Sequence, residues 1–150
     1  IDMFLTNVKE KNKNILDVGC GYGIIGIVVS KVNDSFSTLV DVNKRCIHLT
    51  KRNIELNKVK GKAFISDAYE NVDEMYDYVL TNPPIRTGKE KVKEILLNAP
   101  LKDNGELWCV IRKEQGAKSY INCLKEKYNV NIVKKEKGFY IIMAKKTIDI

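Results

Sequence analysis

One stretch constrains the fold of this chain more than any other, residues 14–26, which read NILDVGCGYGIIG. A short apolar run leads into a loop with three alternating glycines, and a second apolar run follows at 24–29. Several glycines directly after a strand indicate that the backbone turns tightly and that something packs closely against it. The stretch therefore predicts a strand–loop–helix unit of an α/β fold with a binding function in its loop.

The glycines fit two classes of cofactor loop. Residues 21–26 satisfy the G-x-G-x-x-G pattern of dinucleotide-binding folds, and Asp41 follows at about the expected distance of 20 residues. Residues 17–23 instead read D-x-G-x-G-x-G, the spacing of a loop that binds S-adenosylmethionine. The loop by itself does not choose between them.

Strands and helices alternate along the rest of the chain. Apolar runs predict strands at 15–18, 37–42, 62–66, 76–81 and 105–111, and periodicity predicts helices at 3–8, 24–29, 43–57, 92–99 and 117–128. The last two strands, 130–134 and 139–144, have a link too short for a crossover helix, so we expect an antiparallel hairpin. Helix 24–29 is apolar on every side, which predicts that it is sandwiched in the core. These elements predict a single α/β domain over 1–150, with a Rossmann-like, doubly wound, mostly parallel seven-stranded sheet.

Ligands of such sheets bind beyond the carboxyl ends of the strands. The glycine loop, Asp41, Asp67 and Asn82 all fall at such ends. Asp41 suits a bidentate acceptor for two ribose hydroxyls, and its alternative role is a helix cap in competition with Asn43. Asp67 can accept from an adenine amino group while the Ala68 N–H serves a ring nitrogen, although an aspartate after a strand is also a common cap.

A second loop, residues 81–89, reads TNPPIRTGK. Proline has no N–H and a fixed φ, and the residue before it is held extended, so Asn82, Pro83 and Pro84 form a rigid element that presents carbonyl oxygens. The Asn82 side chain and the Pro83 main chain can accept from one NH2 group and draw its lone pair toward an electrophilic methyl group. We expect strand 76–81 to be central, which favours this interpretation over a plain Pro-Pro turn.

The segments LDVGCGYG, VDVN, SDA and TNPPIRTGK, in this order, resemble class I S-adenosylmethionine-dependent methyltransferases that act on exocyclic or amide nitrogens. NPPIRTGK together with residues 111–117 is similar to a narrower methyltransferase small-domain group, typified by the RsmC-type 16S rRNA guanine-N2 methyltransferases. The resemblance covers nearly all of residues 14–146. It implies S-adenosylmethionine as cofactor and the exocyclic N2 amine of a guanine in small-subunit ribosomal RNA as methyl acceptor.

The resemblance also implies roles for particular residues. The cofactor would be held by Asp17, Gly19, Cys20, Gly21, Gly23, Asp41, Asp67 and Ala68. Asn82 and Pro83 would be catalytic, and the substrate would contact Pro84, Ile85, Arg86 and Lys89. Arg86 and Lys89 can meet a phosphate backbone, whereas we expect Lys91 and Lys93 to lie on a solvated helix face. A guanine in folded RNA must be flipped out to reach such a pocket.

Other functions stay open at this point. Methyltransferases of adenine N6 in nucleic acid, or of a protein glutamine amide, more often carry an aromatic residue after the second proline, where this chain has Ile85. A dinucleotide-dependent oxidoreductase would need a catalytic domain that 150 residues do not supply. A non-catalytic RNA-binding module would not require the two acceptors of the second loop, the Asn82 side chain and the Pro83 carbonyl.

Composition bears on partners and location. The net charge of +7, from 26 Lys and Arg against 19 Asp and Glu, favours a polyanionic partner. The resemblance implies that this partner is ribosomal RNA or the small ribosomal subunit. No apolar run has the 18 or so residues that a membrane-spanning helix needs, and no leader pattern is present, so we expect a cytoplasmic protein without membrane contact. Four cysteines without a C-x-x-C pair, and one histidine, predict no metal site.

The start of the chain carries a separate expectation. It opens without Met on an apolar segment, residues 1–8, so we expect further residues upstream. Residues 1–13 are also shorter than the segment, with its substrate-side loop, that members of the resembled group usually carry. We therefore assign no site residue there.

Overall fold

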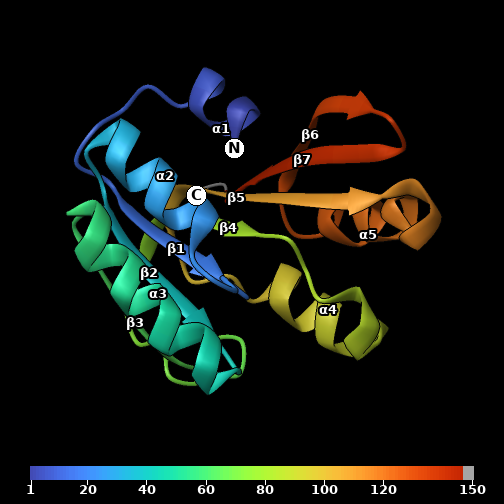
Figure 1. The fold of residues 1–150 in the computed structure, drawn as a ribbon. Helices are drawn as coiled ribbons and strands as arrows, with labels where there is room; N and C mark the ends of the chain where they lie inside the picture. Colours follow the sequence, from blue (N-terminus) through green and yellow to red (C-terminus); the bar gives the residue numbers. More distant parts are fainter. Residues whose placement is uncertain (147–150) are drawn as a thin grey trace.

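The computed structural model describes residues 1–146; residues 147–150 of the expected domain lie outside the described part. The elements, in chain order, are α1 (Asp2–Asn7), β1 (Asn14–Val18), α2 (Ile24–Asn33), β2 (Phe36–Asp41), α3 (Lys44–Asn57), β3 (Gly61–Ile65), β4 (Tyr76–Thr81), η1 (Ile85–Thr87), α4 (Lys89–Leu97), β5 (Leu101–Arg112), η2 (Lys113–Gln115), α5 (Ala117–Lys125), β6 (Asn129–Glu136) and β7 (Phe139–Lys145) (Figure 1). The seven strands form one sheet in the order β3-β2-β1-β4-β5-β7-β6. Strands β1 to β5 are parallel, and β7 pairs antiparallel with both β5 and β6, which confirms the predicted fold class and hairpin.

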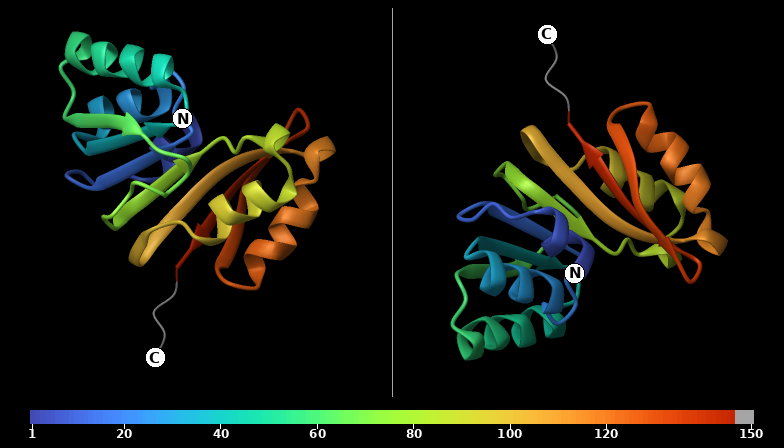
Figure 2. Two further views of the ribbon diagram at one scale, coloured as in Figure 1. Left: turned by 90° about the horizontal axis from the view of Figure 1, so that it is seen from below. Right: turned by 90° about the horizontal axis from the view of Figure 1, so that it is seen from above.

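Helices cover both faces of this sheet (Figure 2). Helices α4 and α5 lie on one face, where Leu96, Leu124 and Ile142 are among the fully buried side chains of the largest core cluster. Helices α1, α2 and α3 lie on the other face, where Phe4 and Trp108 belong to one core cluster and α2, α3 and β2 share another. This two-sided arrangement is the doubly wound architecture.

The expectation that the helix after the glycine loop is sandwiched in the core is wrong. Ile27 and Val29 are buried, but Ile24 is 65% exposed and Val32 is 58% exposed. Helix α2 belongs to an outer layer, so only one side of it meets the sheet and the other faces solvent. An apolar residue on such an outer side is common, because protein surfaces are largely apolar in area.

The register between β1 and β4 brings the two predicted loops together. Val18 is paired with Thr81, so the glycine loop and the Asn82 loop leave neighbouring strands at the same level. The Thr81 hydroxyl donates to the Val18 carbonyl at 3.1 Å, at the point where both strands end. We call this side of the sheet, where β1 to β5 end, the carboxyl edge.

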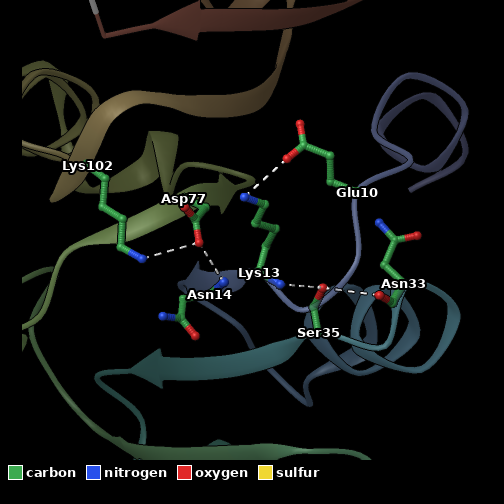
Figure 3. A network of polar contacts seen from close by, with 7 residues as sticks. All are labelled: Glu10, Lys13, Asn14, Asn33, Ser35, Asp77 and Lys102. Atoms are coloured by element: carbon green, nitrogen blue, oxygen red, sulfur yellow. Dashed lines mark hydrogen bonds and ion pairs between the residues drawn. The ribbon is translucent and has the colours of Figure 1, made fainter. Parts of the chain in front are cut away.

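A polar network secures the opposite edge (Figure 3). Asp77, at the start of β4, accepts from the Asn14 N–H at 2.9 Å and pairs with Lys102 at 3.4 Å. Lys13, in the linker after α1, pairs with Glu10 at 3.2 Å, and its N–H donates to Ser35 at 3.4 Å. These contacts tie the starts of β1, β2, β4 and β5 together and thereby help to fix the level at which the strands end at the carboxyl edge.

Candidate active site

A cavity of about 590 Å³ opens at the carboxyl edge, where β1, β2, β3 and β4 end. Its wall is formed by Val18, Gly19, Asp41, Val42, Ser66, Asp67, Ala68, Asn82, Pro84, Thr87, Lys91 and Ile95. Six of the predicted site residues therefore meet around one space, although they come from four different segments of the chain. We call this space the main cavity.

The glycine loop is held in place by the neighbouring strand β2 and by α3. The Gly21 N–H donates to an oxygen of Asp41 at 2.9 Å, while the Thr50 hydroxyl donates to the Gly21 carbonyl at 2.9 Å. Asn53 donates to the Tyr22 carbonyl at 2.9 Å. The loop is therefore fixed from two sides, and Thr50 and Asn53 are positioning residues that the sequence did not reveal as such.

Gly23 and Gly26 explain why the stretch also satisfied the dinucleotide pattern. Gly23 has a φ of +91°, and a Cβ there would lie 2.9 Å from the Thr50 side chain. A Cβ on Gly26 would lie 2.7 Å from the Leu39 side chain on β2. The third glycine of the pattern thus allows α2 to pack closely on the sheet, the same role that it has in dinucleotide-binding folds.

Asp17 lies beneath the loop and outside the main cavity. Its carboxylate is 1% exposed and accepts from the Gly26 N–H at 3.0 Å. Burial raises its pKa from 3.8 to about 7, against the lowering effect of the Gly26 hydrogen bond. Asp17 therefore joins the end of β1 to the start of α2, and its position supports the loop rather than direct contact with a ligand.

Asp41 occupies the place expected for a ribose acceptor at the end of β2. One carboxylate oxygen accepts from Gly21 and the other accepts from the Asn43 N–H, also at 2.9 Å. The helix cap is made by Asn43 instead, whose side chain accepts from Arg45 and Cys46. A carboxylate has about four lone-pair sites, so Asp41 keeps acceptor capacity toward the main cavity while it orders the loop.

Asp67 and Lys91 form an ion pair in the wall of the main cavity. Lys91 Nζ lies 2.6 Å from Asp67 Oδ1, and a second carboxylate, that of Glu94, lies 3.6 Å away. The hydrogen bond to Asp67 raises the pKa of Lys91. The expectation that Lys91 lies on a solvated helix face is wrong, because the side chain is only 28% exposed and turns toward the end of β3.

Ala68 places its backbone at the same point of the main cavity. Its φ is +50°, a conformation that costs a non-glycine residue roughly 1–2 kcal/mol. The Ser66 hydroxyl donates to the Ala68 carbonyl at 2.8 Å and accepts from the Asn71 N–H at 3.1 Å. Ser66 thus holds the turn that presents Asp67 and Ala68 side by side.

The Asn82 loop has the rigid form that its prolines predict. Pro83 is buried, while Asn82 and Pro84 are exposed. The Pro83 carbonyl accepts from the Ile85 N–H at 2.9 Å, and the Pro84 carbonyl accepts from both the N–H and the hydroxyl of Thr87. A carbonyl oxygen has two lone pairs, so Pro83 keeps one for a further donor.

The other predicted site residues lie around the main cavity rather than in its wall. Ile85, Arg86 and Lys89 follow the Asn82 loop, and both basic residues are exposed. Cys20 is half-buried behind the glycine loop, where its thiol donates to the Gly21 carbonyl at 3.6 Å. Burial raises the pKa of this thiol to about 12, so it stays protonated at neutral pH.

A second hollow, of about 420 Å³, lies on the opposite face of β4. Its wall is almost entirely apolar and comprises Ile1, Met3, Phe4, Ile25, Leu80, Thr81, Trp108, Cys109, Val110 and Ile141. Thr81 belongs to this wall, and Asn82, the next residue, belongs to the wall of the main cavity. The Asn82 loop therefore starts between two spaces, and we call the second one the apolar hollow.

Within residues 1–146, no group of three or more His, Cys, Asp and Glu side chains is placed to hold a metal ion. None of the helices in that part of the chain is both long and apolar enough to cross a membrane.

Comparison with known proteins identifies the family. The sequence matches the methyltransferase small domain family over residues 2–143. The chain belongs to this family. It is a methyltransferase domain that uses S-adenosylmethionine, and the main cavity has fitting groups for that cofactor: a glycine loop at one helix N-terminus and two carboxylates, Asp41 and Asp67, at separate points of one wall.

Several small-domain methyltransferases and related proteins are similar in sequence. Uncharacterized protein YbxB of Bacillus subtilis is 46% identical over 144 residues, which is 91% of this chain and 72% of the relative. Ribosomal RNA small subunit methyltransferase C of Buchnera aphidicola is 35% identical over 141 residues, or 89% of this chain and 40% of the relative. A putative protein N5-glutamine methyltransferase of Methanocaldococcus jannaschii is 38% identical over 86 residues, which is 57% of this chain and 44% of the relative.

A solved structure shows the same fold. The 16S rRNA N2 G1207 methyltransferase RsmC of T. thermophilus, in complex with AdoMet and guanosine, superimposes with a TM-score of 0.81 at 21% identity. The match covers 91% of this chain but 38% of that enzyme. This chain thus spans less than half the length of the RsmC proteins that it matches.

Proposed function

We propose that this chain, acting as one domain, methylates the exocyclic N2 amine of a guanine in small-subunit ribosomal RNA. The observation that carries the proposal is the position of Asn82. Its amide stands at the wall of the main cavity, one residue after Thr81 in the wall of the apolar hollow. A planar amine held there would face the cofactor on one side while its ring lies against apolar side chains on the other.

The chemistry follows from the acceptors on this loop. Asn82 Oδ1 and the free lone pair of the Pro83 carbonyl accept the two N–H groups of the target amine. Two acceptors on one NH2 turn its lone pair out of conjugation with the ring, toward the main cavity. Bound S-adenosylmethionine supplies an electrophilic methyl group on a sulfonium. A new N–C bond forms as the S–C bond breaks, and the cationic product loses its proton to water, so no general base with an unusual pKa is required.

The cofactor-side residues have matching roles in this proposal. Asp41 accepts the ribose hydroxyls, and Asp67 accepts from the adenine amino group beside the Ala68 N–H. The glycine loop, which Asp17 supports, lies at the N-terminus of α2 and contains Gly19, Cys20, Gly21 and Gly23. The helix dipole at this N-terminus favours the carboxylate of the cofactor. Pro84 and Ile85 frame the target, and Arg86 and Lys89 lie where a phosphate backbone would pass.

A protein glutamine amide is the second candidate acceptor. The similarity to the M. jannaschii protein, whose name refers to that modification, favours it. Two features weigh against it. The sequence has Ile85, and not an aromatic side chain, after the second proline, and the net charge of +7 suits a polyanion better than a protein side chain.

Nucleoside analysis separates these candidates. The protein is incubated with methyl-labelled S-adenosylmethionine and, in parallel, with naked ribosomal RNA, assembled small subunits, DNA and protein extract. We expect label in RNA or subunits, recovered as N2-methylguanosine after digestion. Label in N6-methyladenosine, or in methylglutamine of a protein, would contradict the proposal and name the acceptor that replaces guanine.

A further inference from the structure

The face of β5 and β7 opposite α5 lacks a covering helix over its outer part (Figure 2, right). Cross-strand pairs place Trp108 beside Met143, Val110 beside Ile141 and Arg112 beside Phe139, so these side chains share one face. The inner pair is buried or half-buried near α1, where Trp108 packs edge-on against Phe4 at 5.3 Å. The outer pair, Arg112 and Phe139, has no such cover.

This face continues the apolar hollow toward the carboxyl edge. Val110 and Ile141 line the apolar hollow, and they also line a shallower depression with Phe139, Glu136 and Lys137. The two depressions thus share a wall. A chain segment that enters the apolar hollow beside Asn82 can leave it over Val110 and Ile141 and reach Phe139.

The end of this path combines an aromatic ring with cations. The Arg112 guanidinium lies 4.6 Å over the Phe139 ring. Lys113 follows Arg112 directly, and its N–H donates to the Gly138 carbonyl at 2.8 Å, which brings Lys113 against the β6–β7 turn that carries Lys137. Carboxylates are also present: Glu114 lies 3.4 Å from Arg112, and Glu136 lies 3.2 Å from Lys134. In the part of the chain that the structure describes, no carboxylate pairs with Lys113 or Lys137.

The distance from this group to Asn82 suits a few nucleotides. Arg112 lies three residues beyond Cys109, which is level with Thr81, and three extended residues span about 10 Å. Strand β7 lies two strand spacings from β4, which is also about 10 Å. Exposed ion pairs such as Arg112 with Glu114 contribute little to stability and yield readily to a polyanion.

We propose that Phe139, Arg112, Lys113 and Lys137 form a stacking platform for the single-stranded RNA that flanks the target nucleotide. A base stacks on the outer face of the Arg112–Phe139 pair, since guanidinium planes and aromatic rings both accept unstacked bases. The adjoining phosphates contact Lys113 and Lys137. Lys134 and Lys135 are left out of the platform, because lysines on an edge strand such as β6 also serve to prevent strand pairing.

This proposal rests on the proposed function for its choice of RNA, but its test is independent of methyl transfer. A short single-stranded RNA of mixed sequence, carrying a fluorophore, is titrated with protein, and anisotropy gives the dissociation constant across a range of salt concentrations. The variants are the double substitution Lys113→Gln/Lys137→Gln, the single substitution Phe139→Leu, and Phe139→Tyr as its conservative partner. The charge-matched control is Lys58→Gln/Lys125→Gln, at the ends of α3 and α5 and far from the carboxyl edge.

We expect the double substitution on the platform to lower the slope of log affinity against log salt by about 1.4, because each phosphate contact on a single strand contributes about 0.7. Phe139→Leu should weaken binding about tenfold, and Phe139→Tyr should restore it. The control pair should retain the slope of the unmodified protein. All variants should bind S-adenosylmethionine with unchanged affinity, which shows that they are folded.

Three results would overturn the platform: no RNA binding by the unmodified protein, equal slopes for the platform pair and the control pair, or unchanged RNA affinity for Phe139→Leu. A change of oligomeric state in Phe139→Leu, measured by sedimentation without any loss of RNA binding, would assign the face to a second copy instead. If the RNA effects hold but no N2-methylguanosine forms, the platform stands and the proposed acceptor fails. If guanine is methylated while every variant binds RNA equally, the proposed acceptor stands and the platform fails.

Discussion

Lys91 Nζ lies 2.6 Å from Asp67 Oδ1, so the helix that follows the Asn82 loop is tied to the turn after β3. The two residues come from different elements that line the main cavity, and both side chains are partly exposed, at 28% and 51%. Ion pairs with this exposure contribute little to folding, because water and salt screen them. The pair therefore does little for stability, and its consequence is to fix the direction of the Asp67 carboxylate.

Lys91→Met should weaken S-adenosylmethionine binding about fivefold and should leave the melting temperature nearly unchanged. The physical reason is that Asp67 then loses the partner that holds its second oxygen toward the cavity. Isothermal titration calorimetry and thermal denaturation measure the two quantities. Lys93→Met, on the same helix, is the matched control, and tighter cofactor binding by Lys91→Met would show that the ion pair competes with the cofactor.

Asn82→Ala should reduce methyl transfer by about 10²–10³-fold, the usual effect of losing one well-placed hydrogen-bonding group from a reacting centre. Cofactor affinity should stay within about twofold, because Asn82 acts on the amine and the glycine loop is untouched. Single-turnover transfer and equilibrium cofactor binding give the two values. Transfer at the unmodified rate would disprove the role of the Asn82 side chain as an acceptor.

Gly26→Ala should destabilise the protein by about 1–3 kcal/mol, because the new Cβ would lie 2.7 Å from Leu39 and 3.2 Å from Asp17 Oδ2. Chemical denaturation measures the loss. Leu39→Val in the same chain should recover part of it, since the shorter side chain leaves room for the methyl group. Strictly additive losses in the double variant would mean that the contact with Leu39 is not the cause.

Asp17 should make stability depend on pH. Because burial raises its pKa from 3.8 to about 7, the folded protein keeps this proton in a range where the unfolded chain has released it. The stability that the proton contributes is present in full below the unfolded value and is lost as pH rises through about 7. Denaturation across this range should show a steeper fall with rising pH for the unmodified protein than for Asp17→Asn.

The Asp17→Asn variant keeps an oxygen that can accept from Gly26, so the comparison isolates the charge. Asp103→Asn, at an exposed position, is the control and should retain the slope of the unmodified protein. Equal slopes for Asp17→Asn and the unmodified protein would show that Asp17 is ionised throughout.

Much of the site could be predicted because it lies where strands end. Asp41, Asp67, Ala68 and Asn82 each follow a strand that apolar periodicity reveals, and parallel strands bring their carboxyl ends to one edge. The prolines around Asn82 fix the backbone locally, so the form of that loop is also a property of the sequence. In each case the information lies within a few neighbouring residues.

Contacts between distant segments could not be predicted in this way. The side chain of Lys91 turns toward Asp67, 24 positions earlier, and nothing in the helical pattern of α4 distinguishes it from Lys93. Thr50 and Asn53 looked like ordinary residues of α3, yet their side chains bind the Gly21 and Tyr22 carbonyls. The predicted burial of helix 24–29 on every side was wrong for a related reason, since hydrophobicity does not tell which side of a helix meets the sheet.

The glycine stretch, residues 14–26, shows both what the sequence determines and what only the tertiary structure decides. By itself the sequence determined that residues 14–26 form a strand, a tight loop and a helix, because glycine spacing and apolar runs act through local backbone sterics. Only the tertiary structure decided how the loop is used: Gly26 is set against Leu39, Asp17 is buried below it, and Asp41, Thr50 and Asn53 hold it from neighbouring elements. These contacts depend on packing between segments far apart in the chain, where side-chain direction and distance are set by the whole fold.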